Sequence, residues 1–123
     1  MIYLDTHVVV WLYAGLTEKL SEQAKKLINE NDCLISPIVK LELQYLYEIG
    51  RITAEPDDIV KDLSKHIGLK VCDKDFAEVV DVACTITWTR DPFDRLIVAN
   101  ALSNNELLLT ADSHILSNFS KAV

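Results

Sequence analysis

The sequence predicts a single α/β domain in which helices flank a central, mostly parallel sheet of four or five strands. Short apolar runs alternate along the chain with longer segments of helical spacing, and some helical segments follow one another directly. No repeat, low-complexity stretch or long linker interrupts this pattern. Strands that are joined through helices run parallel, so the residues that follow them meet at one edge of the sheet, where α/β proteins bind ligands.

Length and composition indicate one domain in the cytoplasm. The chain has 123 residues, of which 50% are hydrophobic, and we expect residues 1–123 to form a single core. The start MIYLDTH lacks the features of a secretory signal, and no apolar run approaches the roughly 18 residues that cross a membrane. Cys33, Cys72 and Cys84 form no C-x-x-C pair, so we expect buried thiols rather than disulfides or a zinc site.

The first half of the chain contains two predicted strands and three predicted helices. In order, these are a strand at 1–4, helices at 7–14 and 21–31, a strand at 33–35 and a helix at 37–50. Gly15 ends the first helix, because glycine is the usual residue just after a helix. Ser36 is placed to cap the third helix, since Pro37 takes its first position.

The second half adds two strands and four helices. After a break at Pro56, these are a helix at 57–66, a strand at 69–72, a helix at 74–87 with Asp73 as its cap, a helix within 90–101, a strand at 107–109 and a short helix at 113–118.

The segment RDPFDRLIVANA, at 90–101, carries two aspartates at the start of a helix. With Asp91 as the N-cap, Pro92 takes the first helical position and Asp94 the third, which is similar to a capping box. Asp91 therefore has a sufficient structural role. Asp94 has a shorter side chain than the glutamate that usually reaches back to the backbone N–H of the N-cap residue, so its carboxylate is freer to point elsewhere. We expect the positive end of the helix to lower its pKa and keep it ionised.

Two further aspartates follow predicted strands, Asp5 directly and Asp112 within the segment LLLTAD. Asp5 comes after the first strand and Asp112 after the last, so both are expected at the ligand-binding edge. A helix cap or a loop acid is the commoner role for a single aspartate in such a place. Neither residue alone indicates a site.

Glu42 lies on a helical face that is otherwise apolar. At about 100° per residue, Ile38, Tyr45, Leu46 and Ile49 fall within an arc of roughly 100°, and Glu42 falls inside that arc. We therefore expect Glu42 to be buried, where a carboxylate must be paired, protonated or bound to a metal. We favour the metal, and a buried ion pair with an arginine is the alternative.

The charge of the chain has to be weighed against this cluster of acids. A net charge of −7 argues against a nucleic-acid partner, because phosphate is bound largely by lysine and arginine. Divalent cations held by the acids would reverse the local field. Carboxylate oxygens suit Mg²⁺ or Mn²⁺, which activate water and neutralise charge on phosphorus. Hydrolysis of a phosphodiester is the reaction that this chemistry favours.

Four sequence blocks resemble those of the PIN-domain nucleases, and in particular the VapC-type toxins of bacterial toxin–antitoxin pairs. In order along essentially the whole chain they are IYLDT, PIVKLEL, DPFDRLIVANA and LLTAD. The first and last are weak individually, but the four in this order are specific, and DPFDR is the most telling. The resemblance implies a PIN fold and a Mg²⁺- or Mn²⁺-dependent endoribonuclease.

The resemblance also implies roles for residues and a set of partners. The metal-binding and catalytic acids that it implies are Asp5, Glu42, Asp94 and Asp112. Thr110 and Thr6 support the site through hydrogen bonds, and Asp91 either joins through a water or only caps its helix. The substrate is RNA. The resemblance further implies a homodimer that a cognate antitoxin inhibits. In this family the antitoxin is often a small DNA-binding protein whose C-terminal segment lies across the active site.

Contacts to RNA and the competing functions stay open. Arg90 and Arg95 flank the acids and are placed to touch phosphate, and a surface ion pair with neighbouring acids is the alternative. The stretch ITWTR departs from the family pattern, since Trp88 and Thr89 stand where relatives often have basic or histidine residues. A phosphotransfer domain with Asp5 as acceptor would want a D-x-D motif that is absent. A catalytically silent binding module would be favoured by the loss of an acid, and none is lost.

Overall fold

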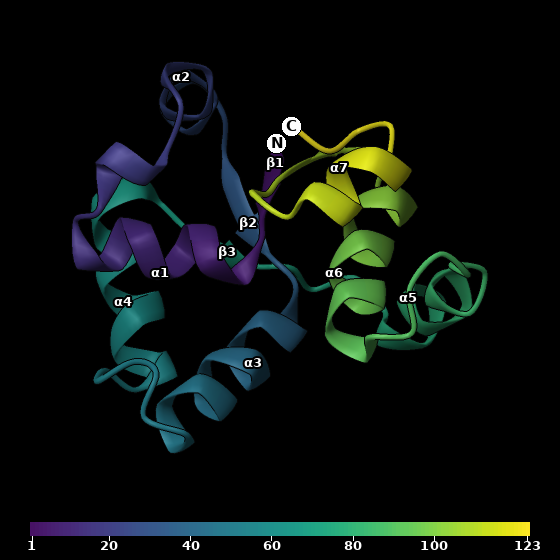
Figure 1. Ribbon diagram of the computed structural model, residues 1–123, viewed down its shortest axis with the longest axis horizontal. Coiled ribbons are helices and arrows are strands. Elements are labelled where there is room, and N and C mark those ends of the chain that lie inside the picture. The colour runs from purple at the N-terminus through teal and green to yellow at the C-terminus, as the bar shows by residue number, and fades with distance from the viewer.

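The computed structural model describes residues 1–123 and contains one sheet of four strands (Figure 1). The strands are β1 (Ile2–Leu4), β2 (Cys33–Ile35), β3 (Lys70–Val71) and β4 (Leu107–Leu109). Their order in the sheet is β3-β2-β1-β4, and every neighbouring pair runs parallel. An isolated bridge between Leu108 and Ala122 lies outside the named strands and does not make a fifth one. The predicted parallel sheet is therefore confirmed, with four strands.

Helices cover both sides of the sheet and one of its ends. They are α1 (Thr6–Ala14), α2 (Glu22–Glu30), α3 (Pro37–Glu48), α4 (Pro56–Ile67), α5 (Phe76–Ala83), α6 (Pro92–Ser103) and α7 (Ser113–Asn118), with a 3-10 turn, η1, at Thr17–Lys19. In Figure 1, α1 and α4 lie on one side of the strands and α5 and α6 on the other. α3 lies below the strands and contacts both α4 and α6, so it closes the carboxyl end of the sheet. None of the helices combines the length and apolar character that spanning a bilayer requires.

Local sequence explains where several helices begin and end. Ser36 accepts the N–H of Ile38 and Pro37 takes the first position of α3, as predicted. Gly15 ends α1 with a φ of 72°, in the left-handed region that other residues rarely adopt. Pro56, predicted to be a break before a helix, is instead the first residue of α4, a position where its missing N–H costs nothing.

The helix predicted at 74–87 is shorter than expected. Asp73 does not cap it; Asp75 does, by accepting a backbone N–H with its Oδ1 at 3.2 Å. At the other end, the hydroxyl of Thr85 donates to the carbonyl of Val82 at 2.6 Å. This local bond satisfies a carbonyl of the last turn, and a loop then leads to α6.

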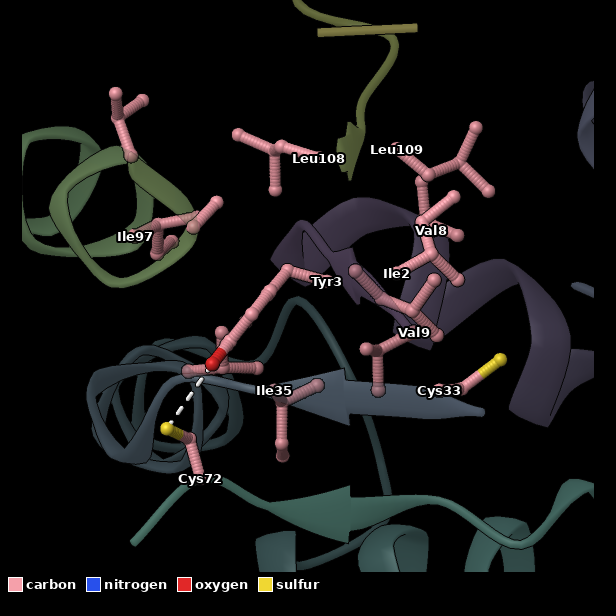
Figure 2. Close-up of a cluster of buried hydrophobic side chains, with 14 of the residues drawn as sticks. Ile2, Tyr3, Val8, Val9, Cys33, Ile35, Cys72, Ile97, Leu108 and Leu109 are labelled. Atoms are coloured by element: carbon pink, nitrogen blue, oxygen red, sulfur yellow. Dashed lines mark hydrogen bonds between the residues drawn. The ribbon is translucent and has the colours of Figure 1, made fainter. Parts of the chain in front are cut away.

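Apolar strand residues form the centre of the core. Ile2 and Ile35 are fully buried on adjacent strands. Val8 from α1 and Ile97 from α6 pack around the same strands (Figure 2). Helices on both faces explain why β1, β2 and β4 are continuous apolar runs rather than alternating ones.

One buried polar contact ties β1 to more distant segments. The hydroxyl of Tyr3 donates to Sγ of Cys72 at 3.1 Å (Figure 2) and accepts a hydrogen bond from the Asn104 amide. Cys33 and Cys72 are buried, as predicted, and no disulfide forms. The prediction was wrong for Cys84, which is exposed because it lies at the end of α5 rather than inside a longer helix.

The parallel register brings the ends of β1 and β4 together. Leu4 pairs with Leu109, and the N–H of Asp5 donates to the carbonyl of Leu109 at 3.0 Å. The residues that follow these two strands, Asp5 and Thr110, are therefore neighbours although they are far apart in the sequence.

Candidate active site

Asp5 is held at the carboxyl end of β1 by two short hydrogen bonds. Asp5 is buried, with only 6% of its surface exposed. Oδ1 accepts the N–H of Thr6 at 2.7 Å, and Oδ2 accepts the hydroxyl of Thr110 at 2.6 Å. Burial raises the pKa of Asp5, and both hydrogen bonds oppose that rise because they favour the charged form. The carboxylate consequently has one fixed orientation.

Glu42 reaches the same end of the sheet from α3. Its Oε1 accepts a short hydrogen bond from the hydroxyl of Thr6, the residue that also donates its N–H to Asp5. Burial raises the pKa of Glu42, the bond from Thr6 lowers it, and the charge of Asp5 raises it again. Thr6 therefore links two of the predicted acids through its backbone and its side chain.

The helical face assigned to Glu42 differs from the prediction. Tyr45 is 50% exposed and Ile49 is 48% exposed, whereas Val39 and Leu43 are fully buried. The true core face of α3 thus lies beside the predicted stripe, and Glu42 is partly buried at its border. The projection failed because α3 covers the end of the sheet and leaves a row of apolar residues in solvent.

Asp91 and Asp94 have separate roles at the start of α6. Oδ1 of Asp91 accepts the N–H of Phe93 at 2.8 Å and that of Asp94 at 3.4 Å, which makes it the predicted cap. The carboxylate of Asp94 accepts no hydrogen bond within the chain and is partly buried. Burial, followed by the charge of Asp91, raises its pKa to about 7. The expectation that the helix end would lower this pKa was wrong, because desolvation and nearby carboxylates outweigh it.

Asp112 combines a capping role with a place beside Asp5. Its Oδ1 accepts the N–H groups of His114 at 2.8 Å and Ile115 at 3.1 Å, so it caps α7. Its own N–H donates to the Thr110 hydroxyl at 3.0 Å, and that hydroxyl donates in turn to Asp5. The charge of Asp112 raises the pKa of Asp5. The alternative role as a cap is therefore real and compatible with membership of the acidic group.

The acidic group has no cation partner within the chain. We call its four members, Asp5, Glu42, Asp94 and Asp112, the acidic quartet. None of the ion pairs of the chain involves the quartet, so the arginine pair considered for Glu42 is absent. The charges of the other three all raise the pKa of Asp94.

The four acids influence one another's charge but do not form a ready metal site. No three carboxylate, imidazole or thiolate side chains lie near enough to one another to form a ready metal site. Like charges repel, and oxygen donors with no internal cation suit a hard divalent ion by both charge and chemistry. The residues therefore fit such an ion by donor type and by charge, and holding one would require their side chains to move closer together.

Comparison with known protein families identifies the fold family. The model of the PIN domain matches residues 2–121, which is nearly the whole chain. The chain belongs to the PIN domain family.

A solved structure resembles this PIN domain along almost its entire length. It is the crystal structure of VapBC2 from Rickettsia felis bound to a DNA fragment from their promoter, with a TM-score of 0.64. The two chains are 20% identical over 95% of this chain and 92% of that chain. At this identity the similarity shows the fold alone. No curated protein matches the chain by sequence.

Two arginines and a histidine lie close to acids of the quartet in the sequence of this PIN domain. Nε of Arg95 donates to the carbonyl of Thr89 at 2.8 Å, and Arg90 is exposed. Neither forms an ion pair, so the alternative of a surface pair with neighbouring acids was wrong. His7, which sequence reasoning left aside because it lacks ligand spacing, lowers the pKa of Asp5. Its position two residues after a strand-end aspartate was the available signal.

Proposed function

We propose that this PIN domain is a metal-dependent endoribonuclease and the toxin component of a type II toxin–antitoxin pair. The observation that carries the proposal is the acidic quartet, which has no cation partner and stands at the carboxyl end of a parallel sheet. Partly buried carboxylates without such a partner are costly at neutral pH and favour binding a cation. Ligand sites of α/β folds lie at this same edge.

The quartet would hold Mg²⁺ or Mn²⁺. Such an ion, when bound, supplies Lewis acidity toward water and offsets negative charge on phosphorus. Thr110 and Thr6 orient the carboxylates of Asp5 and Glu42 through the hydrogen bonds described above. Asp91 fixes the start of α6, so that Asp94 is presented toward the other acids.

Basic residues near the quartet would contact the RNA backbone. The terminal guanidinium nitrogens of Arg95 make no hydrogen bond within the chain, and Arg90 is exposed beside the cap of α6. Guanidinium groups are suited to phosphate because they can donate two parallel hydrogen bonds. We assign Arg90 and Arg95 to phosphate binding.

The proposed partners are a cognate antitoxin and a second copy of the chain. The similar VapBC2 structure, which is bound to a DNA fragment from their promoter, supports the antitoxin. The exposed residues Leu41, Tyr45 and Ile49 follow one another at four-residue intervals along α3 and are each 48–56% exposed. An apolar row of this kind on one helix face supports self-association. With RNA as substrate, we place the protein in the cytoplasm.

The experiment is cleavage of an end-labelled RNA by the purified chain with Mg²⁺, with Mn²⁺ and with EDTA. We expect cleavage only with a metal, and its loss in Asp5→Asn and Asp94→Asn variants whose circular dichroism is unchanged. Asp81→Asn, which neutralises an exposed acid on α5, is the matched control. Full cleavage by both quartet variants would overturn the assignment.

A further inference from the structure

We propose that a cavity between α1, η1 and the loop after β4 is a subsite for one unpaired nucleobase of the RNA substrate. The inference rests on the proposed function and extends it from the reaction to the way in which the substrate is gripped. The cavity has a volume of about 170 Å³ and its walls are mostly apolar, including Val8, Leu20 and Leu109. Trp11 supplies its one aromatic surface, and Lys19 is the one charged side chain in its lining.

The lining suits a base together with its phosphate. Nζ of Lys19 lies 5.8 Å from the centroid of the Trp11 ring, in the range of a cation–π contact. A flat aromatic group beside a cation is the combination that single-strand binding proteins use, because every base has a face that can stack and every nucleotide carries a phosphate. Trp11 is partly exposed near the end of α1, and an exposed aromatic ring is costly to leave in water, which favours an apolar occupant.

The cavity and the acidic quartet have Thr110 as a common neighbour. Thr110 lines it and at the same time donates its hydroxyl to Asp5 at 2.6 Å. Along α1, the ring of His7 lies 6.3 Å from that of Trp11, and His7 follows Asp5 by two residues. The proposed subsite and the carboxylate of Asp5 therefore contact the same side chain, that of Thr110.

The net charge of the chain favours RNA binding through base stacking rather than through a broad basic surface. The chain carries a net charge of −7, so attraction of RNA to the overall surface is weak. Stacking does not depend on net charge and needs only an accessible ring face. One base held beside a single lysine would position the strand without a broad basic surface.

The occupant must be unpaired. A base in a duplex is stacked between its neighbours, and bringing it out costs free energy that a single contact with Trp11 does not recover. We expect the chain to choose loops and single-stranded regions, and to bind duplex RNA without using Trp11.

Binding is tested in an Asp94→Asn background, with EDTA present, so that no RNA is cut. The probe is a fluorescein-labelled single-stranded RNA, and its dissociation constant is measured by anisotropy. We expect Trp11→Leu to weaken binding roughly tenfold and Trp11→Phe to restore most of the loss, because one stacked base contributes about that much. Lys19→Gln should weaken binding and reduce its salt dependence by about one phosphate contact. Lys26→Gln, at an exposed position on α2, is the matched control and should bind as the parent does.

Two further experiments distinguish the contribution of the base to binding from that of the RNA backbone, and they control for misfolding of the variant. An RNA of abasic nucleotides should bind the parent and the Trp11→Leu variant equally. In a Trp88→Phe background, which leaves Trp11 as the sole tryptophan, ordinary RNA should quench its fluorescence and abasic RNA should not. Quenching that is the same with both RNAs, or unchanged affinity in Trp11→Leu, would overturn the subsite.

The failure of the subsite is distinguishable from the failure of the nuclease. With the quartet intact, Trp11→Leu should raise KM and leave kcat nearly unchanged, since stacking supports the bound substrate and the transition state alike. Metal-dependent cleavage with no dependence on Trp11 would reject the subsite alone. Trp11-dependent binding without any cleavage by the parent chain would reject the nuclease alone.

Discussion

The hydroxyl of Thr110 lies 2.6 Å from Oδ2 of Asp5 and joins the carboxyl ends of β1 and β4 across 105 positions of sequence. The same hydroxyl accepts the N–H of Asp112 at 3.0 Å. One small side chain therefore sets the orientation of one member of the acidic quartet and the backbone of another.

Thr110→Val should damage the site while preserving its shape. The change removes the donor to Asp5, and the pKa of that carboxyl, already raised by burial, should rise further. Unfolding free energy should fall by about 1 to 3 kcal/mol, because a buried oxygen and an N–H lose their partner. Urea denaturation and Mn²⁺ titration measure the two effects. Thr110→Ser, which keeps the hydroxyl, should restore both, and a valine variant with unchanged metal affinity would contradict this role.

Stability without metal should fall as pH rises. Folded Asp94 has its pKa raised from 3.8 to about 7, so from about pH 4 to pH 7 the folded state binds more protons than the unfolded state. The free energy of unfolding therefore decreases through that window, and the raised pKa values of Asp5 and Glu42 add to the slope. Denaturation in EDTA at several pH values measures it, and Mg²⁺ or Mn²⁺ should flatten the curve.

Asp94→Asn provides the control for that slope. It removes a carboxylate that four neighbouring charges oppose, so the metal-free variant should be more stable than the parent near pH 8 by on the order of 1 kcal/mol, after allowance for solvent screening. The advantage should vanish near pH 4, where the parent carboxyl is protonated. An equal pH slope in the two proteins would show that another group is responsible.

Asp91 should tolerate asparagine far better than Asp94 does. Asparagine caps a helix about as well as aspartate, so Asp91→Asn should keep both the start of α6 and RNA cleavage. Asp91→Ala should lower the free energy of unfolding by about 1 kcal/mol through loss of the cap. Thermal unfolding and single-turnover cleavage measure the two effects. Cleavage lost as completely in Asp91→Asn as in Asp94→Asn would make Asp91 a metal ligand.

The apolar row on α3 should control self-association. Leu41→Lys and Ile49→Lys each place a charge in the row at a position that is at least 48% exposed, so the monomer should fold normally. Multi-angle light scattering should report a lower mass for the double variant than for the parent at equal concentration. The matched control, Leu116→Lys on α7, changes an exposed leucine outside the row. A parent chain that is monomeric throughout would reject the homodimer.

Sequence reasoning predicted the sheet and most helices because their signals are local. Gly15, Ser36 with Pro37, and Asp91 with Pro92 each fix a boundary through the backbone of one turn. It failed for the helix after β3, where Asp73 and Asp75 are equally good caps by type. The choice between them depends on packing against α6, which periodicity does not contain.

The site was partly predictable for a related reason. Asp5 and Asp112 follow apolar strands, and the edge that they share follows from parallel connection alone. The environment of Glu42 was not predictable in the same way, because an apolar stripe does not reveal whether protein or solvent covers it. The pKa of Asp94 depends on burial, on the neighbouring Asp91 and on three carboxylates from other segments, so its helix position alone gave the wrong sign.

The pairing of β4 with β1 also imposes an order on biosynthesis. A ribosome that has released the first three strands has produced Asp5 and Glu42 but neither Thr110 nor Asp112. Closing a loop of about a hundred residues is among the later and slower events of folding. A toxic activity that needs this closure would stay latent during translation, and a partner made at the same time would have that interval in which to meet its target.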